Sequence, residues 1–165
     1  LKLDRKRLRQ GQENVIAFVH KPQPGEAPRW GIRDVSLAET PLPPASLERA
    51  QTALKIADDA VQNKRIALGN LATAEESYKQ AILFMEALEP TPAQYARAET
   101  GLKNVQAELK EILASKMFLA TNAKKLGQTA EAEAILRELL LYFPKVDDPR
   151  RQQVEERLAA LQAPK

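Results

Sequence analysis

The chain has 165 residues, of which 44% are hydrophobic and only 5% aromatic, and it carries a net charge of +3 and no cysteine. This length is sufficient for one domain with a substantial core, and the lack of cysteine excludes disulfides and thiolate-based metal or catalytic sites. Alanine and leucine supply most of the apolar content, which favours closely packed helices over a β-sheet core.

The excess positive charge is confined to the first part of the sequence. Residues 1–44 hold eight Lys or Arg against five Asp or Glu, whereas residues 45–165 hold seventeen of each. A neutral body argues against a platform for nucleic acid. No run of about 18 apolar residues occurs, so the sequence predicts no membrane-spanning helix.

Five basic residues cluster at the start of the chain: Lys2, Arg5, Lys6, Arg7 and Arg9. Such a cluster is either a solvated end or a segment that contacts anionic lipid, and the lack of interleaved aromatic residues disfavours a nucleic-acid arm. Because the chain begins with leucine, we expect a processed product or a fragment that a membrane anchor or another domain precedes. We therefore favour a membrane-associated location, on the cytoplasmic side of a membrane or in the periplasm.

Two short segments rich in β-branched and aromatic residues, 14–20 and 30–35, each predict one strand. Residues 21–44 contain six prolines and predict an extended linker. Trp30 lies in this linker, where it either packs on the body or serves as an exposed anchor for a partner. We assign residues 1–44 to a basic, proline-rich N-terminal arm.

A helical domain is predicted over residues 45–165, and Ser46 is suited to cap its first helix. Apolar residues then recur at intervals of three and four, a heptad-like spacing: Leu47, Ala50, Leu54, Ala57, Val61, Leu68, Leu71, Tyr78, Ile82 and Met85. Only Lys64 and Glu75 interrupt this seam. The pattern favours one helix more than 40 residues long.

A competing signal lies in the middle of this seam. Gly69 and Asn70 are typical of a helix end, and Thr73 with Glu76 forms a capping box that starts a new helix. The signal allows two helices in place of one. We favour the single long helix, bent near Gly69, and keep two helices of a divergent repeat as the alternative.

A clear break follows from Glu89 to Pro92, and a second seam with heptad spacing comes after it. Its members are Tyr95, Ala98, Leu102, Val105, Leu109, Ile112, Leu119, Ala123 and Leu126. Because a short turn joins two long seams, we expect an antiparallel helical hairpin.

Two shorter helices are predicted after the second seam. Gly127 suits the left-handed position that ends a helix, and the apolar stripe within residues 130–143 predicts a helix that Pro144 stops. Asp148 and Pro149 then provide an acidic cap and a first-turn proline for the last helix.

The window from Leu113 to Val146 resembles one tetratricopeptide repeat (TPR), a helix–turn–helix unit of 34 residues. The matching residues are Leu119, Ala120, Gly127, Ala132, Leu136 and Pro144. Lys116 and Ala123 depart from the family, which has aromatic residues at those positions.

The resemblance implies that the first helix of this unit lines a concave groove that binds peptides. By resemblance, the contact residues are Phe118, Thr121, Lys124 and Lys125. The alternative is that Met117 and Phe118 simply pack on the first long helix. The clamp of lysine and asparagine with which the family holds a terminal carboxylate does not match this sequence.

No catalytic constellation emerges, since one histidine and no cysteine leave no nucleophile–base pair and no metal-ligand cluster. We expect no enzyme activity and no cofactor. The sequence predicts an all-α protein in which a long antiparallel hairpin is continued by two shorter, TPR-like helices.

We expect this protein to serve as a bacterial scaffold that binds another protein or peptide within a larger, membrane-tethered complex. One alternative is a coiled-coil component that self-associates through its long helices. Another is a protein that binds membrane or nucleic acid through its basic tail.

Overall fold

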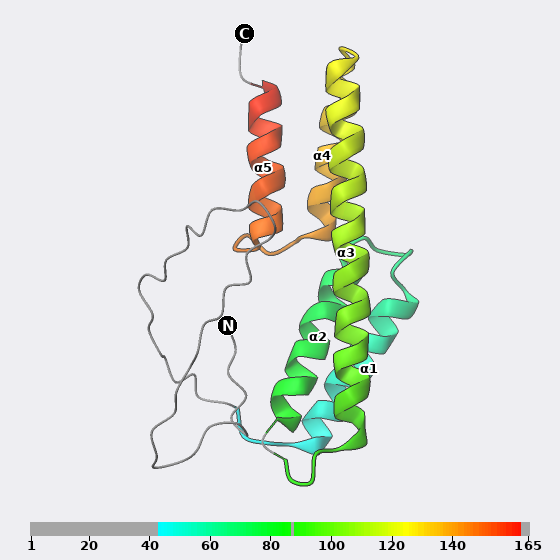
Figure 1. Ribbon diagram of the computed structural model, residues 1–165, viewed down its shortest axis with the longest axis vertical. Helices are drawn as coiled ribbons and strands as arrows, with labels where there is room; N and C mark the ends of the chain where they lie inside the picture. Colours follow the sequence, from blue (N-terminus) through cyan, green and yellow to red (C-terminus); the bar gives the residue numbers. More distant parts are fainter. Residues whose placement is uncertain (1–42, 87, 163–165) are drawn as a thin grey trace, which may run out of the picture. The chain divides into compact units, whose positions relative to one another are not determined.

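The computed structural model describes residues 43–86 and 88–162, which form five helices and no strand (Figure 1). The helices are α1 (Leu47–Gln62), α2 (Asn70–Met85), α3 (Ala93–Lys125), α4 (Thr129–Tyr142) and α5 (Pro149–Gln162). The predicted all-α class is therefore confirmed for this part of the chain. The two predicted strands, Trp30 and the five basic residues at the start lie outside the described residues.

The first seam belongs to two antiparallel helices, α1 and α2 (Figure 1). The Asn63 N–H donates to the Asp59 carbonyl at 3.0 Å where α1 ends, and the Asn70 side chain donates to the Asn63 carbonyl at 2.8 Å across the turn. Helix α2 then begins at Asn70, three residues ahead of the predicted cap at Thr73. The prediction of one long helix is wrong, and the alternative of two helices is correct.

The reversal lets two faces of small residues pack together. Helix α1 buries four alanines, Ala50, Ala53, Ala57 and Ala60. Helix α2 buries Leu71, Ala74, Tyr78 and Ala81. Small side chains permit a close approach of two helices, and a continuous helix would leave both faces in water.

Helix α3 has 33 residues, which gives it a length of about 50 Å. It packs against α2 and also against α4 and α5. Figure 1 shows α1 and α2 beside its first half and α4 beside its second half. The predicted hairpin of two long helices is therefore wrong: one long helix is shared between two pairs of short ones. Among the described helices, none is long and apolar enough to cross a membrane.

The residues of the second seam are buried in the core along only part of α3. Its early members Ala98, Val105 and Leu109 are buried. Its late members Leu119 and Leu126 have 49% and 76% of their surface exposed, contrary to their predicted place in the core. In this half the seam member Ala123 is buried as predicted, together with Ala120, which is not a member of the seam. A straight helix rotates about 20° per heptad relative to a strict seven-residue repeat, so residues at that spacing move away from the core.

The signals that end α3 and begin α5 are confirmed. Gly127 has a φ of 77°, the left-handed conformation that glycine adopts without a Cβ penalty. Asp148 accepts a hydrogen bond from the Arg150 N–H at 2.8 Å, and Pro149 is the first residue of α5. Phe143, at the end of α4, is fully buried and joins a core that runs from α1 to α5.

Gly101 allows α2 and α3 to approach closely. A Cβ at this position would lie 2.5 Å from Cζ of Tyr78. The Tyr78 hydroxyl donates to Asp58 at 2.7 Å, and Asp58 also binds Arg97. Burial and the Asp58 carboxylate raise the pKa of Tyr78 to about 12. The contact therefore fixes the tyrosine that joins the first three helices.

We expect Gly101→Ala to destabilise the protein, although alanine favours a helix interior by about 1 kcal/mol relative to glycine. The added methyl group forces the Tyr78 ring out of its position, at a cost of about 1–3 kcal/mol for such overpacking. Urea unfolding followed by circular dichroism measures the change. Glu99→Ala, on the exposed side of the same helix, is the control and should change stability by less than about 0.5 kcal/mol. A Gly101→Ala variant that is stabilised by the full helix-propensity gain of about 1 kcal/mol would contradict this close contact.

Candidate protein-binding grooves

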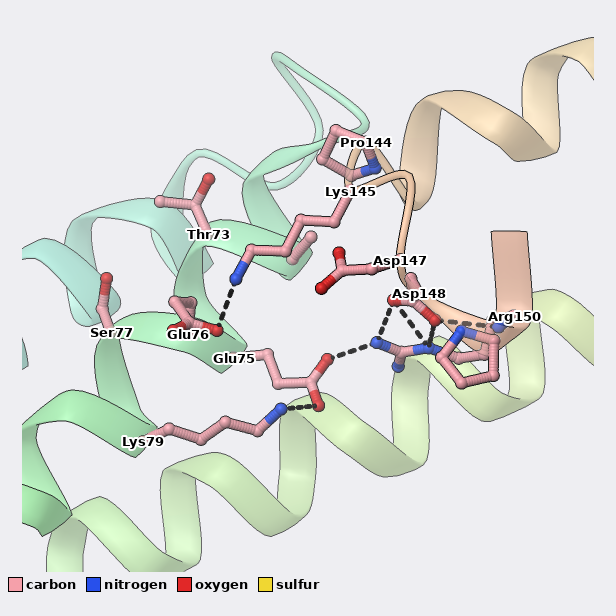
Figure 2. Close-up of a pocket in the computed structure, with 12 residues that line it drawn as sticks. Thr73, Glu75, Glu76, Ser77, Lys79, Pro144, Lys145, Asp147, Asp148 and Arg150 are labelled. Carbon is pink, nitrogen blue, oxygen red and sulfur yellow. Dashed lines mark hydrogen bonds and ion pairs between the residues drawn. The ribbon is translucent and has the colours of Figure 1, made fainter. Parts of the chain in front are cut away.

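A groove of about 530 Å³ opens between α2 and the segment that joins α4 to α5 (Figure 2). We call it the charged groove, because seven of its twelve lining residues carry a charge. The lining comprises Ala72, Thr73, Glu75, Glu76, Ser77, Lys79, Pro144, Lys145, Asp147, Asp148, Pro149 and Arg150.

Arg150 is the cation on which this groove is built. It lies in the first turn of α5, where its guanidinium donates to both carboxylate oxygens of Asp148. Its other side rests over the Phe143 ring, 4.7 Å from the centroid. This bidentate pair and the cation–π contact hold the side chain in one orientation.

Glu75 is the buried anion of the groove, with 7% of its side chain exposed. It accepts hydrogen bonds from Arg150 at 2.7 Å and from Gln106 of α3 at 3.2 Å, and it pairs with Lys79 at 2.8 Å. Burial alone would raise the pKa of Glu75, but the hydrogen bonds from Lys79, Arg150 and Gln106 outweigh it and lower the pKa. The carboxylate is therefore charged at neutral pH and links α2, α3 and α5.

The remaining charges of the groove reinforce this link. Burial would raise the pKa of Asp148, but the hydrogen bonds from Arg150 outweigh burial and lower it. Lys145 pairs with Glu76 at 2.8 Å, an exposed contact that contributes little to stability. Because the three cations are all paired with carboxylates, the main effect of the network is to hold α5 against α2.

A second, smaller groove of about 50 Å³ lies between α3, α4 and α5. We call it the α3–α5 groove. It is lined by Met117, Ala120, Thr121, Lys124, Leu136, Arg157, Ala160 and Leu161. Its floor is thus apolar, and its lining includes two cations and no carboxylate. The Lys124 ammonium of α3 lies 3.4 Å from the Ala160 carbonyl oxygen of α5, so this contact joins the two helices at the edge of the groove.

The structure separates the four residues that the TPR resemblance places in one peptide groove. Thr121 and Lys124 line the α3–α5 groove. Phe118, with 64% of its surface exposed, and Lys125 are not part of that lining. Met117 packs against the core, whereas Phe118 does not. Phe118 and Lys124 are six positions apart on one helix, so their side chains point about 120° apart. The four residues therefore cannot all face one groove.

Two features of the grooves were missed by sequence reasoning. Arg157 joins the α3–α5 groove only because α5 packs beside α3. The Glu75 network, in contrast, is indicated by the sequence, because Lys64 and Glu75 are the charged residues that interrupt the apolar spacing of the first seam. Both have partners on α3: Lys64 pairs with Glu108 at 2.7 Å, and Glu75 accepts from Gln106. A charge on a core stripe therefore predicts a polar partner on the neighbouring helix.

In terms of chemistry, both grooves offer fixed charges and hydrogen-bonding groups. Ser77 lines the charged groove but is itself buried. Within the described residues, no group of three or more His, Cys, Asp or Glu is placed to hold a metal ion. The charged groove is lined mostly by charged side chains, and the α3–α5 groove combines apolar side chains with two cations.

We expect Glu75 to make the fold sensitive to acid. The fold lowers the pKa of Glu75 and of Asp148. As the pH falls through the ordinary carboxylate range, the unfolded chain therefore binds protons before the folded protein does, and the free energy of unfolding decreases. Glu75→Gln should cost about 1–3 kcal/mol at neutral pH and should flatten the loss of stability between pH 5 and pH 3, a window of about two units. Urea midpoints across this pH range measure both effects.

The neighbouring variant Glu76→Gln is the matched control, since its carboxylate is half-exposed and, among the described residues, pairs only with exposed Lys145. It should shift stability by less than about 0.5 kcal/mol. A Glu75→Gln variant that retains the native acid dependence would show that the sensitivity arises elsewhere.

Comparisons with known proteins return no relative: no family model, no curated protein and no solved structure matches this chain. The TPR resemblance therefore stays a prediction. The two grooves and the exposed surface of the helices are what bear on function.

Proposed function

We propose that the protein is a non-enzymatic interaction module that binds an acidic, partly apolar segment of another protein in the α3–α5 groove. The observation that carries this proposal is the lining of the groove. It combines an apolar floor with the cations Lys124 and Arg157 and contains no carboxylate. Such a surface complements a segment that carries both an aliphatic side chain and Asp or Glu.

The floor of the groove limits what enters it. Met117, Leu136 and Leu161 supply apolar surface, and a volume of about 50 Å³ exceeds the share of one water molecule, about 30 Å³. The groove therefore accepts part of one aliphatic side chain, and the rest of the partner lies along its rim.

The rim supplies the charge selection. Lys124 and Arg157 are both exposed, and neither forms an ion pair within the described residues. A guanidinium binds a carboxylate through two parallel hydrogen bonds, which adds direction to the attraction. An acidic segment gains both contacts, whereas a basic one is repelled.

The groove is also held in place before a partner arrives. Arg150 ties the start of α5 to Glu75 of α2, and Gln162 at the other end of α5 donates to Glu133 of α4 at 2.6 Å. With α5 fixed at both ends, binding requires little ordering of the protein, which lowers its entropic cost. The charged groove supports the proposal less, because its four carboxylates outnumber its three cations and disfavour an acidic segment.

The test uses an array of short labelled peptides that combine Leu or Val with Asp or Glu, with lysine in place of the acidic residues as the counterpart set. We expect the acidic set to bind, with an affinity that falls as salt rises. Reversal of both rim charges, Lys124→Glu with Arg157→Glu, should weaken binding at least about tenfold. Fluorescence anisotropy measures the affinity.

Lys55→Glu on the exposed side of α1 is the control with the same kind of charge change, and it should leave peptide binding unaltered. Equal binding of the lysine peptides, or no effect of the rim reversal, would overturn the proposal.

A further inference from the structure

The side of α3 that faces away from the α3–α5 groove carries an exposed aromatic residue at its centre. Phe118 has 64% of its surface exposed, and Leu119 and Leu126 beside it have 49% and 76% exposed. No described part of the chain covers these side chains. A phenylalanine and two leucines on one exposed helix surface are a feature of interaction sites.

Polar residues extend this surface along the helix. Residues at successive spacings of three and four positions lie along one helix face, and one such line runs through Phe118: Glu111, Ala114, Phe118, Asn122 and Lys125. We call them the α3 outer face. Asn122 is half-buried, and the other four are exposed.

The charges of the α3 outer face are arranged symmetrically about Phe118. Glu111 lies seven residues before it and Lys125 seven residues after it, so each charge is about 10.5 Å from the centre along the axis. Neither charge forms an ion pair within the described residues. The face is therefore negative at one end, aromatic in the middle and positive at the other end.

We propose that the α3 outer face binds the same face of a second copy of the protein, in antiparallel orientation about a two-fold axis at Phe118. In a two-fold interface, the contact of residue i with residue j occurs twice. Glu111 of each copy then meets Lys125 of the other, and the two Phe118 rings meet at the axis. A parallel pairing would place Glu111 against Glu111 and is excluded by repulsion.

This interface is independent of the proposed peptide site. Thr121 and Lys124 line the α3–α5 groove, whereas Phe118 and Lys125 do not. The two proposals therefore rest on different residues, and the failure of either proposal leaves the other intact.

Light scattering after size exclusion, on the full chain over a wide range of concentrations, tests the association. We expect a reversible dimer, and we expect Phe118→Ala to raise its dissociation constant at least about tenfold, as for a central aromatic anchor. Circular dichroism confirms that the variant is folded, which is expected because Phe118 lies outside the core. A monomer at every concentration would overturn the proposal.

Charge exchange tests the orientation. Glu111→Lys alone, or Lys125→Glu alone, places like charges together and should weaken the dimer several-fold, whereas the double variant re-forms both pairs in the opposite sense and should recover to within about threefold of the native constant. Lys103→Glu, exposed in the first half of α3, is the control and should have no effect. A dimer insensitive to the single changes, or one that the double change fails to rescue, would overturn the antiparallel arrangement.

Discussion

A charge in the core imposes the arrangement of these helices. The Glu75 carboxylate is almost fully buried, and an ionised carboxylate buried without partners costs more than the roughly 2–7 kcal/mol of a neutral polar group. It is satisfied only when Lys79, Gln106 and Arg150 reach it together. Because the last two come from α3 and α5, the requirement fixes α5 relative to α2. Apolar packing alone would tolerate a sliding of one helix pair along α3, whereas this network selects one position.

Local signals were enough to predict where most helices begin and end. Ser46 accepts from the Arg49 N–H, Gly127 is left-handed, and Asp148 caps α5, each as its residue type suggests. The break between α1 and α2 was not predictable from spacing. Leu68 follows Val61 by seven residues, so the loop preserves the heptad phase, and one long helix and two antiparallel helices give the same pattern. Tertiary packing of the alanine faces decides between them.

The candidate sites show the same division between local and tertiary information. The resemblance to a TPR unit pointed to Thr121 and Lys124 on α3, and the structure places both on a groove. Arg157 completes that rim from α5, thirty-three residues later, so no local pattern could have linked it to Lys124. Sequence spacing also could not show which of two stripes on α3 is buried, because the answer depends on the slow rotation of a straight helix against a heptad repeat.

That rotation gives the second half of α3 one buried and one exposed surface. This half buries Ala120 and Ala123 against α4 and α5, and for that reason Phe118, Leu119 and Leu126 turn outward. If two copies join through the outward surface, the two α3–α5 grooves are related by the same two-fold axis. A partner with two acidic segments then binds the second groove at a high effective concentration, and its overall affinity rises without any new contact. A weak single groove is therefore compatible with stable docking, provided the spacing of the partner's segments matches the distance between the grooves.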